Sequence, residues 1–240
     1  MAITLRDSGN NTAYTANTTI EVTGLSVTSG DIIVVLLGVH QSGATAASNS
    51  VSDSITTSYT IKSEEQEDAN HAPIRIAWGI AGSTDTVTVT GTYDATECRK
   101  SIAVYVFNPN GATITEDFYP TSVGGYVSAD TQITIGNENV ESSDAVAIFG
   151  SSRGGLGAVT WNSPLIDGVA VDGSQTPDGM LMTYTIFSAT DTGVAAAVTP
   201  DVGAQFQMVF LGLQGAAGGG ANPKGPFGLP LHGPFGGPIS

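Results

Sequence analysis

The sequence predicts an all-β protein made of antiparallel strands, and three features of its 240 residues indicate this class. Threonine, serine, valine and glycine are abundant, whereas runs of alanine, leucine, glutamate and lysine at helical spacing are absent. Short stretches alternate polar and apolar side chains with the period of two that a half-buried strand requires. Glycine and proline separate these stretches, as expected for turns. Because 40% of the residues are hydrophobic, such strands can enclose a large core.

The first half of the chain contains a series of expected strands. Residues 18–22 alternate, and residues 31–37 form an apolar run, which is typical of a central strand covered on both faces. The last expected strand ends before the sequence Asn108-Pro109-Asn110-Gly111, which predicts a tight turn. The other strands are expected at residues 50–61, 72–80, 85–92 and 101–107.

The second half repeats this order of motifs. Asp144 begins an apolar run like the one at Asp31, and the triplet at 84–86 returns at 190–192. The sequence therefore predicts two related antiparallel β-sandwich units, jelly-roll or immunoglobulin-like, at residues 1–112 and 113–216. The two halves form either separate domains or one larger sandwich. The remaining matches join residues 131–135 to 18–22, 180–187 to 72–80, and 205–213 to 101–107.

Residues 217–240 differ from the rest of the chain and predict an extended Gly/Pro-rich C-terminal tail. The sequence Gly-Pro-Phe-Gly occurs twice in this tail, and its prolines disfavour both a helix and a central strand. Such a segment cannot bury itself, so we expect it to dock on a neighbouring chain or across a homo-oligomer; the alternative is that it lies on its own domain. The expected partner-binding anchors are Pro226, Phe227, Leu229, Leu231, Pro234, Phe235 and Ile239.

Net charge limits the partners that the chain can bind. The formal charge is −15 with only 7 lysines and arginines, which disfavours nucleic acid and anionic membranes. Cys98 is the only cysteine, so the sequence predicts no internal disulfide and no thiolate metal cage. The beginning of the sequence lacks the pattern of a signal peptide, and the apolar run at 32–39 is too short to span a bilayer. We expect synthesis in a cytoplasm without export.

Motifs for catalysis are missing from the sequence. No Gly-x-Ser-x-Gly elbow, phosphate-binding loop or His-Glu-x-x-His motif occurs. His40, His71 and His232 lie far apart in different surroundings. The acidic run at 64–68 could hold Ca²⁺, but it lacks the ligand spacing of a calcium loop and favours a solvated loop. The sequence therefore predicts no catalytic residue, no metal site and no cofactor, and a protein that is not an enzyme.

A binding site for carbohydrate is the alternative that the sequence leaves open. Trp161 reads as a core residue, but with Asn162 and Asp167 it could instead form a sugar platform on a loop of the second half. This arrangement would make the chain a carbohydrate-binding adhesion module of a phage or a cell surface.

Three segments of the first half carry a resemblance to known proteins. A Gly-Asp pair leads into an apolar strand within residues 27–34, and the motif Ala-Gly-x-Thr-Asp-Thr-Val-Thr-Val ends the segment 78–89. Residues 51–54 with 59–60 lie between them. This pattern resembles β-sandwich structural proteins of bacteriophage virions, of the capsid-decoration, head-fibre and tail-component type.

The resemblance implies a role in assembly and carries over no catalytic residue. It implies that the chain is a virion structural protein, a capsid decoration or a tail component. Its implied partners are the major capsid or tail proteins of the same virion and further copies of itself. Its implied location is the virion.

Overall fold

The computed structural model describes most of the chain before the tail, with gaps between the described segments. Every regular element within them is a β-strand, and all strand pairs are antiparallel, so the predicted all-β sandwich class is confirmed. The described residues are 3–15, 17–40, 48–63, 74–93, 98–119, 121–127, 131–140, 144–152, 156–161, 169–171, 180–200 and 204–215.

The first half of the chain forms two facing sheets. Sheet A contains, in spatial order, β1 (Thr4–Thr15), β8 (Cys98–Asn108), β3 (Ile32–His40), β6 (Ile74–Ile80) and β5 (Thr60–Ser63). Sheet B contains β2 (Thr19–Val27), β7 (Asp85–Tyr93) and β4 (Ser48–Asp53). Apolar side chains from both sheets fill the space between them, including Val22, Leu25, Val35, Val89 and Val104. Sheets A and B are therefore a β-sandwich, which we call unit 1.

The second half forms a second sandwich, unit 2. Sheet C contains β10 (Thr121–Val127), β17 (Ala204–Gly215), β12 (Ala145–Ser152), β15 (Met180–Phe187) and β14 (Val169–Val171), with β9 (Ile114–Phe118) also paired to β17. Sheet D contains β11 (Ile133–Val140), β16 (Asp191–Pro200) and β13 (Leu156–Trp161). The core between these sheets includes Ile135, Phe149, Phe187, Val194 and Phe210.

The sheet order of unit 2 repeats that of unit 1. When β9 and β10 are counted together as the first strand of unit 2, the order of the smaller sheet in each unit is the second, seventh and fourth strand, and the larger sheets match in the same way. One difference lies at the first strand, because β1 pairs along the length of β8, whereas β9 and β10 share this role on β17. The division of the chain into domains at residues 112 and 113 stays a prediction.

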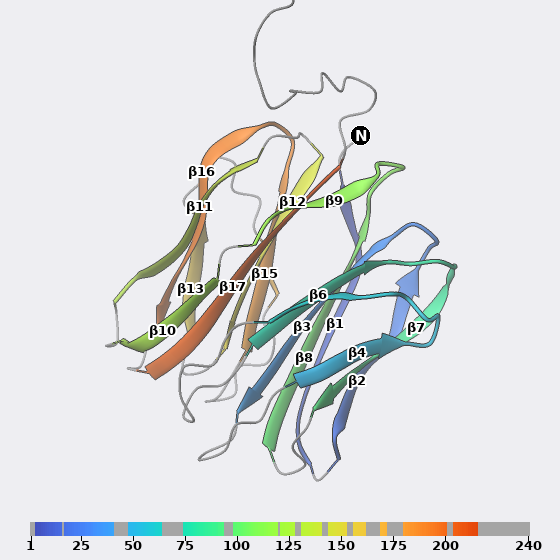
Figure 1. Ribbon diagram of the computed structural model, residues 1–240, viewed down its shortest axis with the longest axis horizontal. Coiled ribbons are helices and arrows are strands. Elements are labelled where there is room, and N and C mark those ends of the chain that lie inside the picture. The colour runs from blue at the N-terminus through green and yellow to red at the C-terminus, as the bar shows by residue number, and fades with distance from the viewer. Residues whose placement is uncertain are drawn as a thin grey trace, which may run out of the picture.

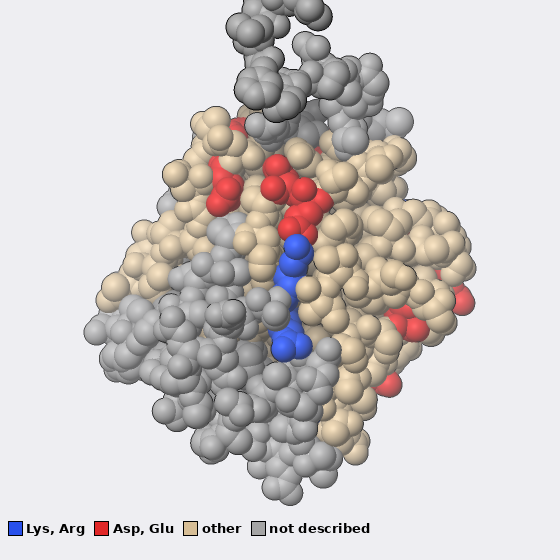
Figure 2. Space-filling model, in the orientation of Figure 1, with Lys and Arg blue, Asp and Glu red and all other residues tan. Residues whose placement is uncertain are grey.

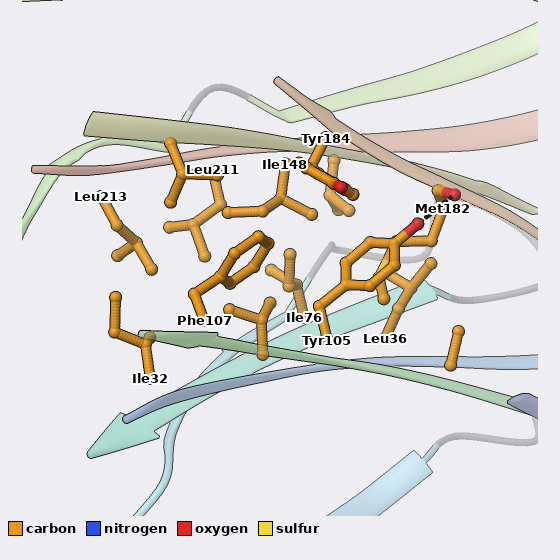
Figure 3. Packing of buried hydrophobic residues seen from close by; sticks show 14 of the residues in the cluster. Ile32, Leu36, Ile76, Tyr105, Phe107, Ile148, Met182, Tyr184, Leu211 and Leu213 are labelled. Carbon is orange, nitrogen blue, oxygen red and sulfur yellow. Dashed lines mark hydrogen bonds between the residues drawn. The ribbon is translucent and has the colours of Figure 1, made fainter. Parts of the chain in front are cut away.

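Sheets A and C pack face to face, so the molecule has four layers in the order B, A, C, D (Figure 1). The core between them includes aromatic side chains from both units. Figure 3 shows Tyr105 and Phe107 of sheet A pointing toward Tyr184 of sheet C. The ring of Tyr184 lies edge-on to both, with centroid distances of 5.0 Å to Tyr105 and 5.2 Å to Phe107. Such edge-to-face contacts add to the stabilisation that apolar burial provides.

The four-layer order explains why β3 is apolar on both faces. Residues 32–37 are at most 1% exposed, which confirms the prediction of a central strand covered on both sides. Ile33 and Val35 face sheet B, whereas Val34 and its alternate neighbours face sheet C. In β12 the residues that face the unit's own partner sheet begin at Ala145. Aligning Asp31 with Asp144 therefore matches residues of β3 that face sheet B with residues of β12 that face sheet A. An alignment shifted by one residue instead matches the side chains that lie inside each sandwich.

Candidate functional site

The candidate site is a cavity of about 420 Å³ that opens to solvent at one end of unit 1. It lies where the beginning of β1, the turn before β3, the end of β6 and the turn after β8 come together. This volume falls within the range of about 300–1,000 Å³ that is usual for ligand pockets. The residues that define it are Arg6, Asp31, Ile80, Asn108, Ala112 and Ile114.

An ion pair between Arg6 and Asp31 forms the polar part of the cavity wall. Asp31 is 1% exposed, and its Oδ2 atom lies 2.5 Å from Nε of Arg6. The Nη2 group of Arg6 donates to Oδ1 at 3.1 Å, and the main-chain N–H of Thr28 donates to Oδ2 at 2.7 Å. Arg6 lies at a break in the β1–β8 register between Leu5 and Asp7, and such a bulge redirects a side chain. The guanidinium is therefore held in a fixed orientation with part of it at the surface.

Two tight turns form the rest of the wall. In the turn before β3, the N–H of Asp31 donates to the carbonyl of Thr28 at 2.9 Å, and Gly30 has a φ of 91°. In the turn after β8, Asn110 and Gly111 both have positive φ, as a type I′ turn requires. These bonds and backbone conformations set the shape of the cavity before any partner binds.

The second turn is the one predicted from the sequence Asn108-Pro109-Asn110-Gly111, and that prediction is confirmed. The N–H of Ala112 donates to the carbonyl of Pro109 at 3.1 Å. The Asn108 side chain accepts from the N–H of Asn110 at 2.8 Å, which fastens the turn to the end of β8. A turn that was expected only to end a strand is also a wall of the cavity.

The rim of the cavity is apolar. Ile80 is 42% exposed, although the other residues of β6 are buried or partly buried, and Ile114 is only partly buried. Among the described residues, one other large apolar side chain is exposed to a similar degree, that of Ile61 at 38%. An apolar rim beside a guanidinium suits a ligand that offers an apolar group flanked by carbonyl oxygens.

The described chain ends beside this cavity. Gly215 is the last residue of β17, and it pairs with Ile114 of the cavity wall. Its N–H donates to the carbonyl of Asp144 at 2.6 Å, and a Cβ atom added to it would lie 2.9 Å from Cβ of Ala112. In Figure 1 the red end of β17 lies near β9. The last described residue before the tail therefore lies beside the cavity wall.

Most of the site residues predicted from the sequence lie outside the described residues. Trp161 belongs to β13, where it pairs with Ala196, but its side chain is outside the description. Asn162 and Asp167, the rest of the predicted glycan site, also lie outside the described ranges. The same holds for the tail anchors Pro226, Phe227, Leu229, Leu231, Pro234, Phe235 and Ile239.

A second polar cluster joins the two units at the surface. Nζ of Lys62 on β5 lies 2.8 Å from Oε1 of Glu116 on β9, and the indole N–H of Trp78 points to Oε2 of Glu116 at 3.4 Å. Nζ of Lys62 is also 5.7 Å from the ring centroid of Tyr119. Figure 2 shows basic side chains in a stripe on this face, with acidic side chains gathered at its upper end. We call Lys62, Trp78, Glu116 and Tyr119 the seam cluster.

The described side chains show no arrangement for metal chemistry. No group of three or more His, Cys, Asp or Glu residues is placed to hold a metal ion within the described ranges. Nor does the described part contain a helix of the length and hydropathy needed to cross a membrane.

A further polar arrangement surrounds Asp53 and organises a turn. Its Oδ1 atom accepts from the N–H groups of Ile55 and Thr57, both at 3.0 Å, and its Oδ2 atom accepts from the Tyr59 hydroxyl at 2.8 Å. Burial raises the pKa of Tyr59, and the hydrogen bond to Asp53 raises it further. A phenol with a raised pKa stays protonated at neutral pH, so this group is a hydrogen-bond donor that holds the turn.

Comparison with known proteins adds no relative. No protein-family model, no curated protein and no solved structure matches the chain.

Proposed function

We propose that the chain is a non-enzymatic structural protein of a virion, either a capsid decoration or a tail component. It assembles through its β-sandwich body and its extended C-terminal tail. The observation that carries this proposal is that β17, the last described strand, ends at Gly215 beside an open cavity in a body with three apolar cores, two residues before the tail starts in the sequence.

The body supports the proposal through its construction. Sheets A and C bury one face of each other, so both units share one apolar core and present one rigid surface. Interiors packed in this way resist deformation. A rigid block of this kind suits a particle in which many identical contacts must form at the same geometry.

The tail supports the proposal through its chemistry. Its prolines limit the freedom that the segment loses on binding, and its spaced apolar residues distribute affinity along a groove. The proposed partners are the major capsid or tail proteins of the same virion and further copies of this chain. The proposed location of the working protein is the virion.

Co-sedimentation with purified particles, or with purified shell protein, tests this function. The full-length chain should sediment with the particles, and a chain ending at Ala217 should stay in the supernatant. A full-length chain with Phe227→Ser and Phe235→Ser is the matched control, because it keeps the length and most of the composition of the tail. Failure of the full-length chain to bind would count against the assembly role.

The seam cluster favours a second candidate, the carbohydrate-binding adhesion module. Half-buried Trp78 and the nearby Tyr119 lie beside Lys62 and Glu116, a combination of aromatic and charged groups that suits sugars. A glycan array should then retain the full-length chain, and Trp78→Ala should abolish retention. Binding that depends on Trp161 instead would assign the sugar to the site expected from the sequence.

A further inference from the structure

We propose that the cavity beside Arg6 and Ile80 is the docking site of the chain's own tail. The segment that it takes is the first Gly-Pro-Phe-Gly sequence, with the ring of Phe227 against Ile80. This inference concerns the isolated chain and does not rest on the assembly role.

The described chain ends close to the cavity. Its last residue, Gly215, lies two residues before the tail and pairs with Ile114 in the cavity wall. Roughly ten residues separate Gly215 from Pro226, and a Gly-rich linker of that length has a root-mean-square span of about 16–19 Å. A segment tethered so closely has an effective concentration on the order of millimolar at the cavity. At micromolar protein concentration, the chain's own tail therefore reaches the cavity far more often than a neighbour's tail does.

The cavity matches the segment around Phe227 in shape and in chemistry. The cavity of about 420 Å³ has room for a phenylalanine ring, and the exposed Ile80 offers it an apolar surface. Pro226 restricts the backbone before Phe227 to an extended path, so its carbonyl groups point outward. The guanidinium of Arg6 is fixed by Asp31 and is partly exposed, so it can donate hydrogen bonds to those carbonyls.

The charges of the tail and the body also favour docking. The whole chain has a formal charge of −15. Residues 217–240 contain Lys224 and no aspartate or glutamate, so the tail is drawn toward the acidic body. The negative charge of the chain would repel an acidic protein or a nucleic acid.

Docking in the cavity has one consequence for assembly. The same Phe227 side chain cannot occupy the cavity and a site on a partner at the same time. Binding to a partner through Phe227 would therefore require release of this side chain from the cavity.

The test uses a fluorescent synthetic peptide of residues 222–240 and measures its anisotropy with two forms of the protein. A chain ending at Ala217 retains all three described cores, which lie between Ile3 and Leu213, and it should bind the peptide. The full-length chain should bind at least tenfold more weakly, because its own tail occupies the cavity. Equal binding to both forms would overturn the proposal.

Substitutions at two isoleucines test the location. Ile80→Glu in the shortened chain should abolish peptide binding, whereas Ile61→Glu should leave it unchanged, because Ile61 is comparably exposed but does not line the cavity. Thermal unfolding of both variants checks that the body remains folded. Equal effects of the two substitutions would contradict docking in the cavity. The full-length chain should be a monomer at micromolar concentration. A dimer that is lost when the tail is removed would show that each tail docks on the other copy, and this would overturn docking within one chain.

Discussion

The hydroxyl of Tyr105 donates a 2.8 Å hydrogen bond to the main-chain carbonyl of Met182, and this bond joins β8 of unit 1 to β15 of unit 2 (Figure 3). Tyr105 is 1% exposed, so no solvent competes for the bond. It lies within a core to which both units contribute aromatic rings. The two sandwiches are therefore held together by the same kind of packing that holds each sandwich together.

Replacing Tyr105 with phenylalanine should lower the free energy of unfolding by about 1–2 kcal/mol, because the carbonyl of Met182 loses its donor inside the core. Urea unfolding followed by circular dichroism measures the change. Tyr184→Phe is the matched control, since it keeps the ring contacts and leaves this bond intact. If the two variants are equally stable, the bond between the units contributes nothing of its own.

Gly212→Ala should destabilise the fold by about 1–3 kcal/mol through overpacking. An added Cβ atom at Gly212 would overlap the ring of Phe118, which is already packed against Phe210 at a centroid distance of 5.0 Å. Gly82→Ala is the control, because a Cβ atom there meets nothing within 4 Å. Thermal unfolding should separate the two variants clearly, and similar melting temperatures would mean that the ring of Phe118 moves aside freely.

Arg6→Met should lower the free energy of unfolding by about 2–4 kcal/mol, because it leaves the buried carboxylate of Asp31 without its cation. Lys62→Met removes the cation of a more exposed pair, at 30% and 26% side-chain exposure, and should cost less than about 1 kcal/mol. Denaturant unfolding of both variants gives the comparison. Equal losses would mean that Asp31 gains compensating water when Arg6 is removed.

The Asp53–Tyr59 contact should make stability depend on pH in the alkaline range. Burial and Asp53 raise the pKa of Tyr59 above its usual 10.0, so the folded chain binds this proton more tightly than the unfolded chain does. The resulting stabilisation is complete below pH 10 and is lost as the pH rises above 10. Between pH 9 and about pH 11, Tyr59→Phe should lose less stability than the unsubstituted chain. If the free energy of unfolding changes equally with pH in the two proteins, ionisation of Tyr59 does not affect stability.

The strands and their class could be predicted from the sequence because local alternation records which face of a strand is buried. Ile20 and Val22 are buried while Glu21 is exposed, as the alternation at 18–22 indicates. The apolar run at 32–37 also required cover on both faces, which sheets B and C provide. The sequence could not identify those covering sheets, because contacts between layers depend on the pairing of distant segments.

The cavity was not predictable for a similar reason. Arg6 and Asp31 form an ion pair only because a bulge in β1 aims one side chain at a turn that lies before another strand. A lone arginine in an alternating stretch carries no local signal of this contact. The Gly30-Asp31 pair was visible in the sequence, but only as a turn that precedes a strand.

Quantitative mass spectrometry of gradient-purified particles, from cultures that produce the chain, tests the central claim most directly. The chain should purify with the particles in many copies for each particle, and a version ending at Ala217 should be lost from them. Recovery of the full-length chain only in the soluble fraction, with none on the particles, would contradict a structural role in the virion.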